Sequence, residues 1–299
     1  MVEVTVTFLA ITFLAAVLAG FFGGLFGIGG GAIIVPFLAL FMGVPIHEAI
    51  AISLVSVIAT SNAGGSSYLE QKITNVKLAM YLEVATTAGA LTGSVITLLL
   101  QSWVLFMIFG VLLSYVAFSS FKSRASDERR IIQNKFADVR QDGLSKYLGL
   151  AGSYFDVSQN KQVEYRVKGA SKGAVISSFA GVTAGLLGVG GGIIKVAAMN
   201  MFMNVPLKVA VGTSKFMIGV TAAVGALLFF IAGVVDVYVL APIALGTTVG
   251  ATLGTLIMNR LRSYVLKISF GVLVTYLAYT MFAEGLAVAF KITLPMLGL

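Results

Sequence analysis

A long internal repeat constrains the fold of this chain more than any other feature. Residues 18–121 align with residues 179–282 at a constant offset of 161 and without a gap, and about a third of the aligned positions are identical. The sequence Gly-Ile-Gly-Gly-Gly at 27–31 falls on Gly-Val-Gly-Gly-Gly at 188–192, and a Val-Pro pair follows both after the same interval. The repeat therefore predicts that the chain folds into two halves of similar structure.

Composition places these halves in a lipid bilayer. The 299 residues are 58% hydrophobic and only 11% charged, whereas a soluble domain carries about 25% charged residues. The apolar stretches match bilayer spans of roughly 20 residues. The sequence thus predicts an all-α integral membrane protein with two homologous repeats, an architecture typical of secondary transporters.

The same composition excludes several function classes. The chain has no Cys and one His, so thiolate and histidine metal sites are excluded, and we expect no metal and no cofactor. Acid–base pairs are too scarce within the apolar segments for an enzyme. The net charge of +8 does not indicate nucleic-acid binding, because 11 of the 20 Lys and Arg residues lie in one segment, 122–172.

Each half repeats one order of segments. An apolar segment (5–26 or 173–187) runs into the glycine cluster, and a short apolar piece of 12 residues follows (32–43 or 193–204). As a helix this piece would rise only about 18 Å, against a hydrocarbon core of about 30 Å. It is therefore a half-helix, or one arm of a re-entrant hairpin. Three further helices are expected in each half, near 48–69, 77–100 and 103–121, and near 209–232, 238–258 and 264–283.

A polar segment separates the halves. We expect a first transmembrane repeat at 1–121, a connecting loop at 122–172, and a second repeat with a C-terminal tail at 173–299. Polar and apolar residues alternate at 147–155 and 162–167, which predicts a small β-hairpin outside the bilayer. A partly disordered linker is the alternative.

Basic residues indicate the orientation, because they gather on the cytoplasmic side. If the central loop is cytoplasmic, the turn with Lys72 and Lys77 is cytoplasmic too. Arg260, Arg262 and Lys267 join them only if each half crosses the membrane an odd number of times, which inverts the second half. We expect inverted repeats in the cell membrane with both termini outside; a parallel arrangement of four crossings in each half is the alternative.

The glycine clusters are the first candidate site. A helix break inside the bilayer must line a cavity or be buried in protein, and glycine leaves backbone N–H groups open to a ligand. The half-helix that begins there has a positive N-terminal end, which favours an anion. The alternative is close helix packing through small residues. The candidate residues are Gly27, Gly29, Gly30, Gly31, Gly188, Gly190, Gly191 and Gly192.

Charged residues inside the apolar segments are the second candidate. Lys195 and Lys215 stand where the first half has aliphatic residues, and both lie close to the second glycine cluster. A charge within a span costs about 2.5–3.5 kcal/mol, so it normally has a partner or a task. Two lysines would make a pocket for a small anion, unless they extend to the membrane surface. Glu83, opposite Ala244 in the repeat, would pair with a lysine or carry a proton, or is a shallow solvated carboxylate.

Hydroxyl groups near these lysines complete the set. Ser53 and Ser214 are equivalent in the repeat, and Thr213 precedes Ser214. Such hydroxyls would donate to substrate oxygens, although in membrane helices they often bond backbone carbonyls.

These motifs resemble the TauE/SafE family of sulfite and organosulfonate exporters. The resemblance rests on Gly-Ile/Val-Gly-Gly-Gly after an apolar helix, Val-Pro about 13 residues later, and Gly212-Thr213-Ser214 in the second half. It covers both repeats and implies a substrate such as sulfite, sulfoacetate or a related sulfur anion. The first half has Ala51-Ile52-Ser53 where Gly-Thr-Ser is typical, which argues against a two-fold symmetric role for that motif.

We therefore expect a secondary transporter that moves a small sulfur-containing anion by alternating access, with export as the expected direction. Its partners would be the anion, the lipid bilayer and, if transport is coupled, protons. An anion channel on the same scaffold and a carrier of a different small anion are the alternatives.

Overall fold

The computed structural model describes residues 5–26, 29–121, 136–156, 160–257 and 263–291. Within these residues, seven helices are long and apolar enough to cross a membrane: α1, α3, α4, α8, α10, α11 and α12. The first half contains α1 (Val6–Phe26), α2 (Gly31–Pro36), the π-helix η1 (Phe37–Phe41), α3 (Ile46–Glu70), α4 (Val76–Leu99) and α5 (Ser102–Phe121). The second half contains α8 (Ala170–Leu187), α9 (Gly192–Ala197), the π-helix η2 (Ala198–Phe202), α10 (Leu207–Ile231), α11 (Val237–Ile257) and α12 (Ser263–Phe290).

These bounds agree with the expected segments to within a few residues, except that α12 continues to Phe290, beyond the end of the repeat at 282. The agreement follows from the bilayer itself, because only a continuous apolar helix of about 20 residues satisfies its backbone in lipid.

The short apolar piece of each half is helical and begins inside the glycine cluster. It covers residues 31–41 as α2 and η1, and residues 192–202 as α9 and η2. The residues before these helices, Gly30 and Gly191, both have left-handed backbone, with φ of 73° and 65°. That conformation is favourable only for glycine, which explains why the break falls at equivalent positions in both halves. Pro36 ends α2, but Ala197 ends α9, so the π-helix does not depend on a proline.

Helices of one half pair with helices of the other. In the first pair α1 packs along α11, and in the second pair α8 packs along α4. A Cβ on Gly20 would collide with the backbone of Thr247, and a Cβ on Gly181 would collide with the backbone of Thr86. The repeat offset of 161 relates Gly20 to Gly181 and Thr86 to Thr247, so the two contacts are equivalent. Glycine thus lets the backbones approach closely at two equivalent crossings.

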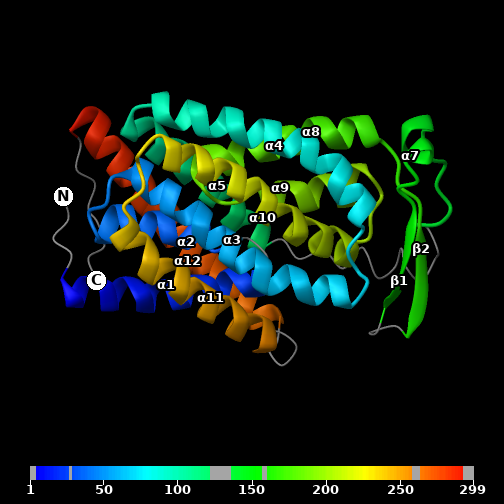
Figure 1. Cartoon of the computed structure of the whole chain (residues 1–299), viewed down its shortest axis with the longest axis horizontal. Coiled ribbons are helices and arrows are strands. Elements are labelled where there is room, and N and C mark those ends of the chain that lie inside the picture. The colour runs from blue at the N-terminus through cyan, green and yellow to red at the C-terminus, as the bar shows by residue number, and fades with distance from the viewer. Residues whose placement is uncertain (1–4, 27–28, 122–135, 157–159, 258–262, 292–299) are drawn as a thin grey trace.

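A small unit outside the helical bundle lies at one end of the molecule, and the beginning of α1 and the end of α12 lie at the other (Figure 1). We call it the hairpin unit; it contains α7 (Gly143–Tyr147), β1 (Gly152–Asp156) and β2 (Lys161–Tyr165). The strands are antiparallel, with Tyr154 opposite Val163. The predicted hairpin is confirmed, although its first strand begins at Gly152 and not at Tyr147, which belongs to α7. Of the residues expected to separate the two strands, 157–159 lie outside the described residues.

Polar contacts fasten the hairpin unit to the helix ends. Asn75, just before α4, donates hydrogen bonds of 2.9 Å to the Leu150 carbonyl and to the Tyr165 hydroxyl. Burial raises the pKa of Tyr165 to about 12, although the bond from Asn75 opposes this shift. Lys208, at the start of α10, forms an ion pair of 2.7 Å with the buried Asp156. The hairpin unit therefore holds the starts of α4 and α10 together.

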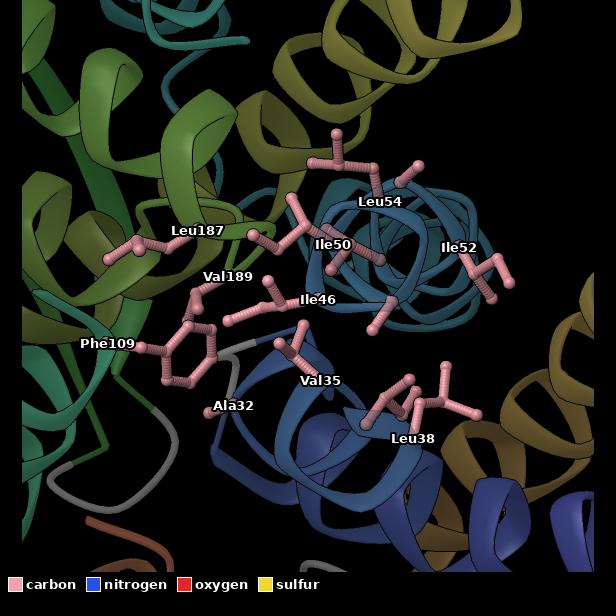
Figure 2. Close-up of a cluster of buried hydrophobic side chains, with 14 of the residues drawn as sticks. Ala32, Val35, Leu38, Ile46, Ile50, Ile52, Leu54, Phe109, Leu187 and Val189 are labelled. Atoms are coloured by element: carbon pink, nitrogen blue, oxygen red, sulfur yellow. The ribbon is translucent and has the colours of Figure 1, made fainter. Parts of the chain in front are cut away.

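The apolar core passes through the glycine breaks. Figure 2 shows Val35 of α2, Ile50 of α3 and Phe109 of α5 gathered around Val189, which lies within the second glycine cluster. These side chains belong to one cluster of buried residues. Residues of both halves therefore pack in this one cluster.

Candidate functional site

Lys195 is completely buried at the second glycine break. Because α9 begins at Gly192, its first turn carries Lys195 into the protein interior, where its exposed fraction is 0%. Its Nζ donates a hydrogen bond of 2.6 Å to Oγ1 of Thr221 on α10. The same Nζ lies 3.9 Å from Oε2 of Glu83 on α4. The lysine thus has both a hydroxyl and a carboxylate to offset the cost of its burial.

Glu83 accepts its hydrogen bonds on one oxygen. Oε1 is 2.7 Å from the Thr221 hydroxyl and 3.3 Å from the Thr87 hydroxyl. Oε2 is buried and has no hydrogen-bond partner among the described residues. The Glu83 side chain as a whole is 13% exposed, although its Oε2 is buried. We call Lys195, Thr221 and Glu83 the buried triad.

Thr221 joins the two charged members of the triad. Its oxygen accepts from Lys195, and its single proton is within reach of both Glu83 Oε1 and the Met217 carbonyl, 3.0 Å away. The sequence alone shows this threonine only as the repeat equivalent of Thr60. The available signal was a repeated threonine together with two charged residues, Lys195 and Glu83, whose equivalents in the repeat are uncharged.

The repeat does not supply a second copy of this arrangement. The repeat places Ile34 opposite Lys195 and Ala244 opposite Glu83. Thr60, opposite Thr221, donates instead to the Gly29 carbonyl at 3.1 Å. The equivalent hydroxyl therefore holds the glycine break in one half and a charged pair in the other.

Lys215 is also buried, with 4% of its surface exposed, but its contacts lie in the other half. Its Nζ donates 2.9 Å to the carbonyl of Gly24, in the last turn of α1, and lies 4.8 Å from the centre of the Tyr68 ring. A helix C-terminus carries partial negative charge, and an aromatic face attracts a cation. Neither Lys195 nor Lys215 extends to the protein surface, so that alternative is wrong for both.

The glycine clusters meet in the interior. A Cβ on Gly31 would collide with the Gly188 carbonyl oxygen, and a Cβ on Gly191 would collide with the Ala180 carbonyl oxygen. Close packing thus accounts for these glycines, and an anion-binding role of their N–H groups stays a prediction. Gly29, Gly30, Gly190 and Gly192 are buried as well, and Gly27 lies outside the described residues.

The three candidate hydroxyls contact backbone in the structure. Ser53 donates to the Gly188 carbonyl at 3.0 Å, and Ser214 donates to the Gly192 carbonyl at 3.3 Å. Thr213 accepts from the backbone N–H of Asn75 at 3.0 Å, which ties α10 to the start of α4. Ser53 and Ser214 thus position the second glycine break, while Thr213 contacts the helix end beside the hairpin unit. Among the residues that the structure describes, no group of acidic or histidine side chains could hold a metal ion.

Comparison with known proteins agrees with this architecture. The family model described as sulfite exporter TauE/SafE matches residues 12–281. A Bacillus subtilis protein named "Probable membrane transporter protein YunE" is 27% identical over 278 residues, which cover 90% of this chain and 95% of that protein. A Xylella fastidiosa protein named "Probable membrane transporter protein" is 25% identical, over 92% of this chain and 95% of its own length. No solved structure was found to match the chain. The chain therefore belongs to the sulfite exporter TauE/SafE family, and it is a membrane transporter, not an enzyme.

Proposed function

We propose that this transporter is a secondary carrier that exports a small sulfur-containing anion, such as sulfite or an organosulfonate. The observation that carries the proposal is the fully buried ammonium of Lys195, held 2.6 Å from a hydroxyl and 3.9 Å from a carboxylate at a helix break. A buried ammonium that is paired with a carboxylate of the protein can give up this partner and pair instead with a substrate anion of the same charge and similar size. Membership of the sulfite exporter TauE/SafE family supports a sulfur-containing substrate.

Alternating access between inverted halves is the mechanism we propose. The two equivalent glycine crossings, at Gly20 and Gly181, support a two-fold relation between the halves. α1 begins at the end of the bundle away from the hairpin unit, whereas its counterpart α8 begins beside that unit (Figure 1). The breaks would then meet at the centre, where a change in the tilt of either half exposes the site to one side.

We also propose that the hairpin unit faces the cytoplasm and that the protein resides in the cell membrane. The support is the distribution of basic residues, since the segment between the halves holds most of them.

The test is sulfite flux into liposomes that contain the purified protein. We expect Lys195→Ala to reduce the flux at least about tenfold, which corresponds to about 1.4 kcal/mol of lost interaction. Lys172→Ala is the matched control, because Lys172 is an exposed lysine in the first turn of α8. Flux of wild-type size in the Lys195 variant would contradict the assignment of that residue.

The identity of the anion is tested by a binding screen with sulfite, sulfoacetate, taurine, thiosulfate and sulfate. Counterflow then separates a carrier from a channel: a carrier exchanges labelled for unlabelled anion and saturates, while a channel shows single-channel currents. Failure of all five anions to bind or move would overturn the proposed function.

A further inference from the structure

We infer that Glu83 is a displaceable counter-ion: it pairs with Lys195 when the site is empty, and it takes up one proton when the substrate anion replaces it. The inference rests on the proposed function, and it adds the proton as a second transported species. Coupling between anion transport and proton transport then depends on one carboxyl group, that of Glu83 on α4.

The geometry favours a pair that can separate. Lys195 makes its short hydrogen bond to Thr221, and its distance of 3.9 Å to Glu83 Oε2 is too long for a direct hydrogen bond. Oε2 has no hydrogen-bond partner among the described residues. The two charges therefore attract each other, but they lack the short, charge-assisted hydrogen bonds that would hold the pair together tightly. An anion oxygen that reaches Nζ would have to replace only this loose contact.

Protonation makes the replacement favourable. With substrate bound, an ionised Glu83 would leave two anions beside a single ammonium in a buried site, which is costly. Protonated Glu83 is neutral, and its new O–H can donate a hydrogen bond to the substrate or to Thr221. Thr221 keeps its bond to Lys195 in either state, so the ammonium need not move.

No other charge is placed to take over this role in the described part of the chain. Of the elements packed against α4, α8 carries Lys172 in its exposed first turn, and α10 carries Lys208 and Lys215. Lys208 pairs with Asp156, and Lys215 donates to the Gly24 carbonyl. On α4 itself, Lys77 is exposed in the first turn. Lys195 is thus the cation that Glu83 faces.

The transport cycle then balances in protons and charge. On one side of the membrane, Glu83 takes a proton from water and the anion binds to the Lys195 ammonium. On the other side the anion leaves, the proton returns to water, and the carboxylate pairs with Lys195 again. One proton and one monoanion cross together without net charge, whereas a dianion would carry one net negative charge.

Calorimetry of sulfite binding in buffers of different ionisation enthalpy tests the inference, because it counts the protons taken up. Sulfite itself also binds protons, so the informative quantity is the difference between wild type and Glu83→Gln, which keeps the shape but cannot ionise. We expect the wild type to take up about one proton more than the variant. The variant should also bind sulfite with a lower Kd that changes less with pH, since the competing carboxylate is gone.

A second variant guards against a folding defect. Glu83→Asp keeps a titratable carboxyl group, so it should retain the additional proton that Glu83→Gln loses. If wild type and Glu83→Gln took up the same number of protons, the inference would be overturned. Sulfite binding by the wild type would still leave the proposed function intact. Absence of any anion binding by the wild type would instead overturn the proposed function.

Discussion

At the scale of residues, the site depends on contacts between positions that are far apart in the chain. The pattern of the sequence marks Lys195, Lys215 and Glu83 as unusual, because each is a charge inside an apolar segment with no equivalent in the other half. It does not reveal the partners. Lys215 ends on the Gly24 carbonyl, 191 positions away, and a backbone carbonyl leaves no signal in a sequence. Thr221 was equally hidden, since a threonine in a membrane helix usually bonds its own backbone.

Asp142 is a carboxylate whose hydrogen bonds tie the hairpin unit to the start of α8. It precedes α7, and its carboxylate accepts from the Gly169 N–H at 2.7 Å, just before α8. Burial alone would raise the pKa of Asp142, but hydrogen bonds from the Ser145 hydroxyl and from the backbone N–H groups of Gly169 and Ser145 lower it below the usual 3.8. Because the folded pKa is below the unfolded one, Asp142 stabilises the fold above the unfolded pKa, and this contribution is lost as pH falls through the folded pKa.

We therefore expect Asp142→Asn to destabilise the hairpin unit near neutral pH and to remove part of its sensitivity to acid. Amide hydrogen exchange of residues 152–156 and 161–165, measured at neutral and acidic pH, checks this expectation. Lys146→Ala, a change in the last turn of the same helix, is the control. Equal acid sensitivity in wild type and Asp142→Asn would show that another group is responsible.

At the scale of elements, the apolar pattern predicts the helices well because the bilayer imposes their length. The half-helices are predictable for the same reason: 11 residues, as in 31–41 and 192–202, cannot cross the hydrocarbon core. The π-helical second part of each was not predicted, since it depends on packing and not on any marker residue. α7 was missed because a helix of only five residues carries no periodic signal.

The two equivalent helix crossings give a paired prediction. Gly181→Ala and Gly20→Ala would each place a methyl group against a backbone carbonyl of the partner helix. We expect each to lower stability by about 1–3 kcal/mol, because neither backbone can move aside without separating the pair. Thermal unfolding in detergent measures the effect. Gly143→Ala is the control, because a Cβ there meets nothing within 4 Å. If the Gly181 and Gly20 variants melted like the control, the close approach would not be needed for stability.

At the scale of the whole molecule, both halves contribute to one centre. Ser53 of the first half holds the carbonyl of Gly188 in the second half, and Lys215 of the second half contacts the end of α1. The repeat predicts that two halves exist, but it cannot say how they interlock, because that relation depends on which side each half enters from. The sequence left inverted and parallel arrangements open, with the positive-inside rule favouring inversion.

Equivalent positions in the two halves test the inversion directly, since the chain has no Cys and a single one can be introduced. Gln71 and Ala232 are related by the repeat and both are exposed. We expect Gln71→Cys and Ala232→Cys to react with a membrane-impermeant maleimide from opposite sides in intact cells. Ser153→Cys on the hairpin unit should react from the same side as Gln71→Cys. Labelling of Gln71→Cys and Ala232→Cys from one side would support the parallel arrangement.

The buried lysines occur in one half only, and this asymmetry explains an advantage of having both halves in a single polypeptide. An assembly of two identical short chains would have to repeat every substitution, and so would enclose four ammonium groups and two Glu83 carboxylates at its centre. Covalent fusion lets one copy keep Ile34 and Leu54 while the other acquires Lys195 and Lys215. Duplication and fusion thereby halve the number of charged groups buried in the interior and allow the two copies to specialise.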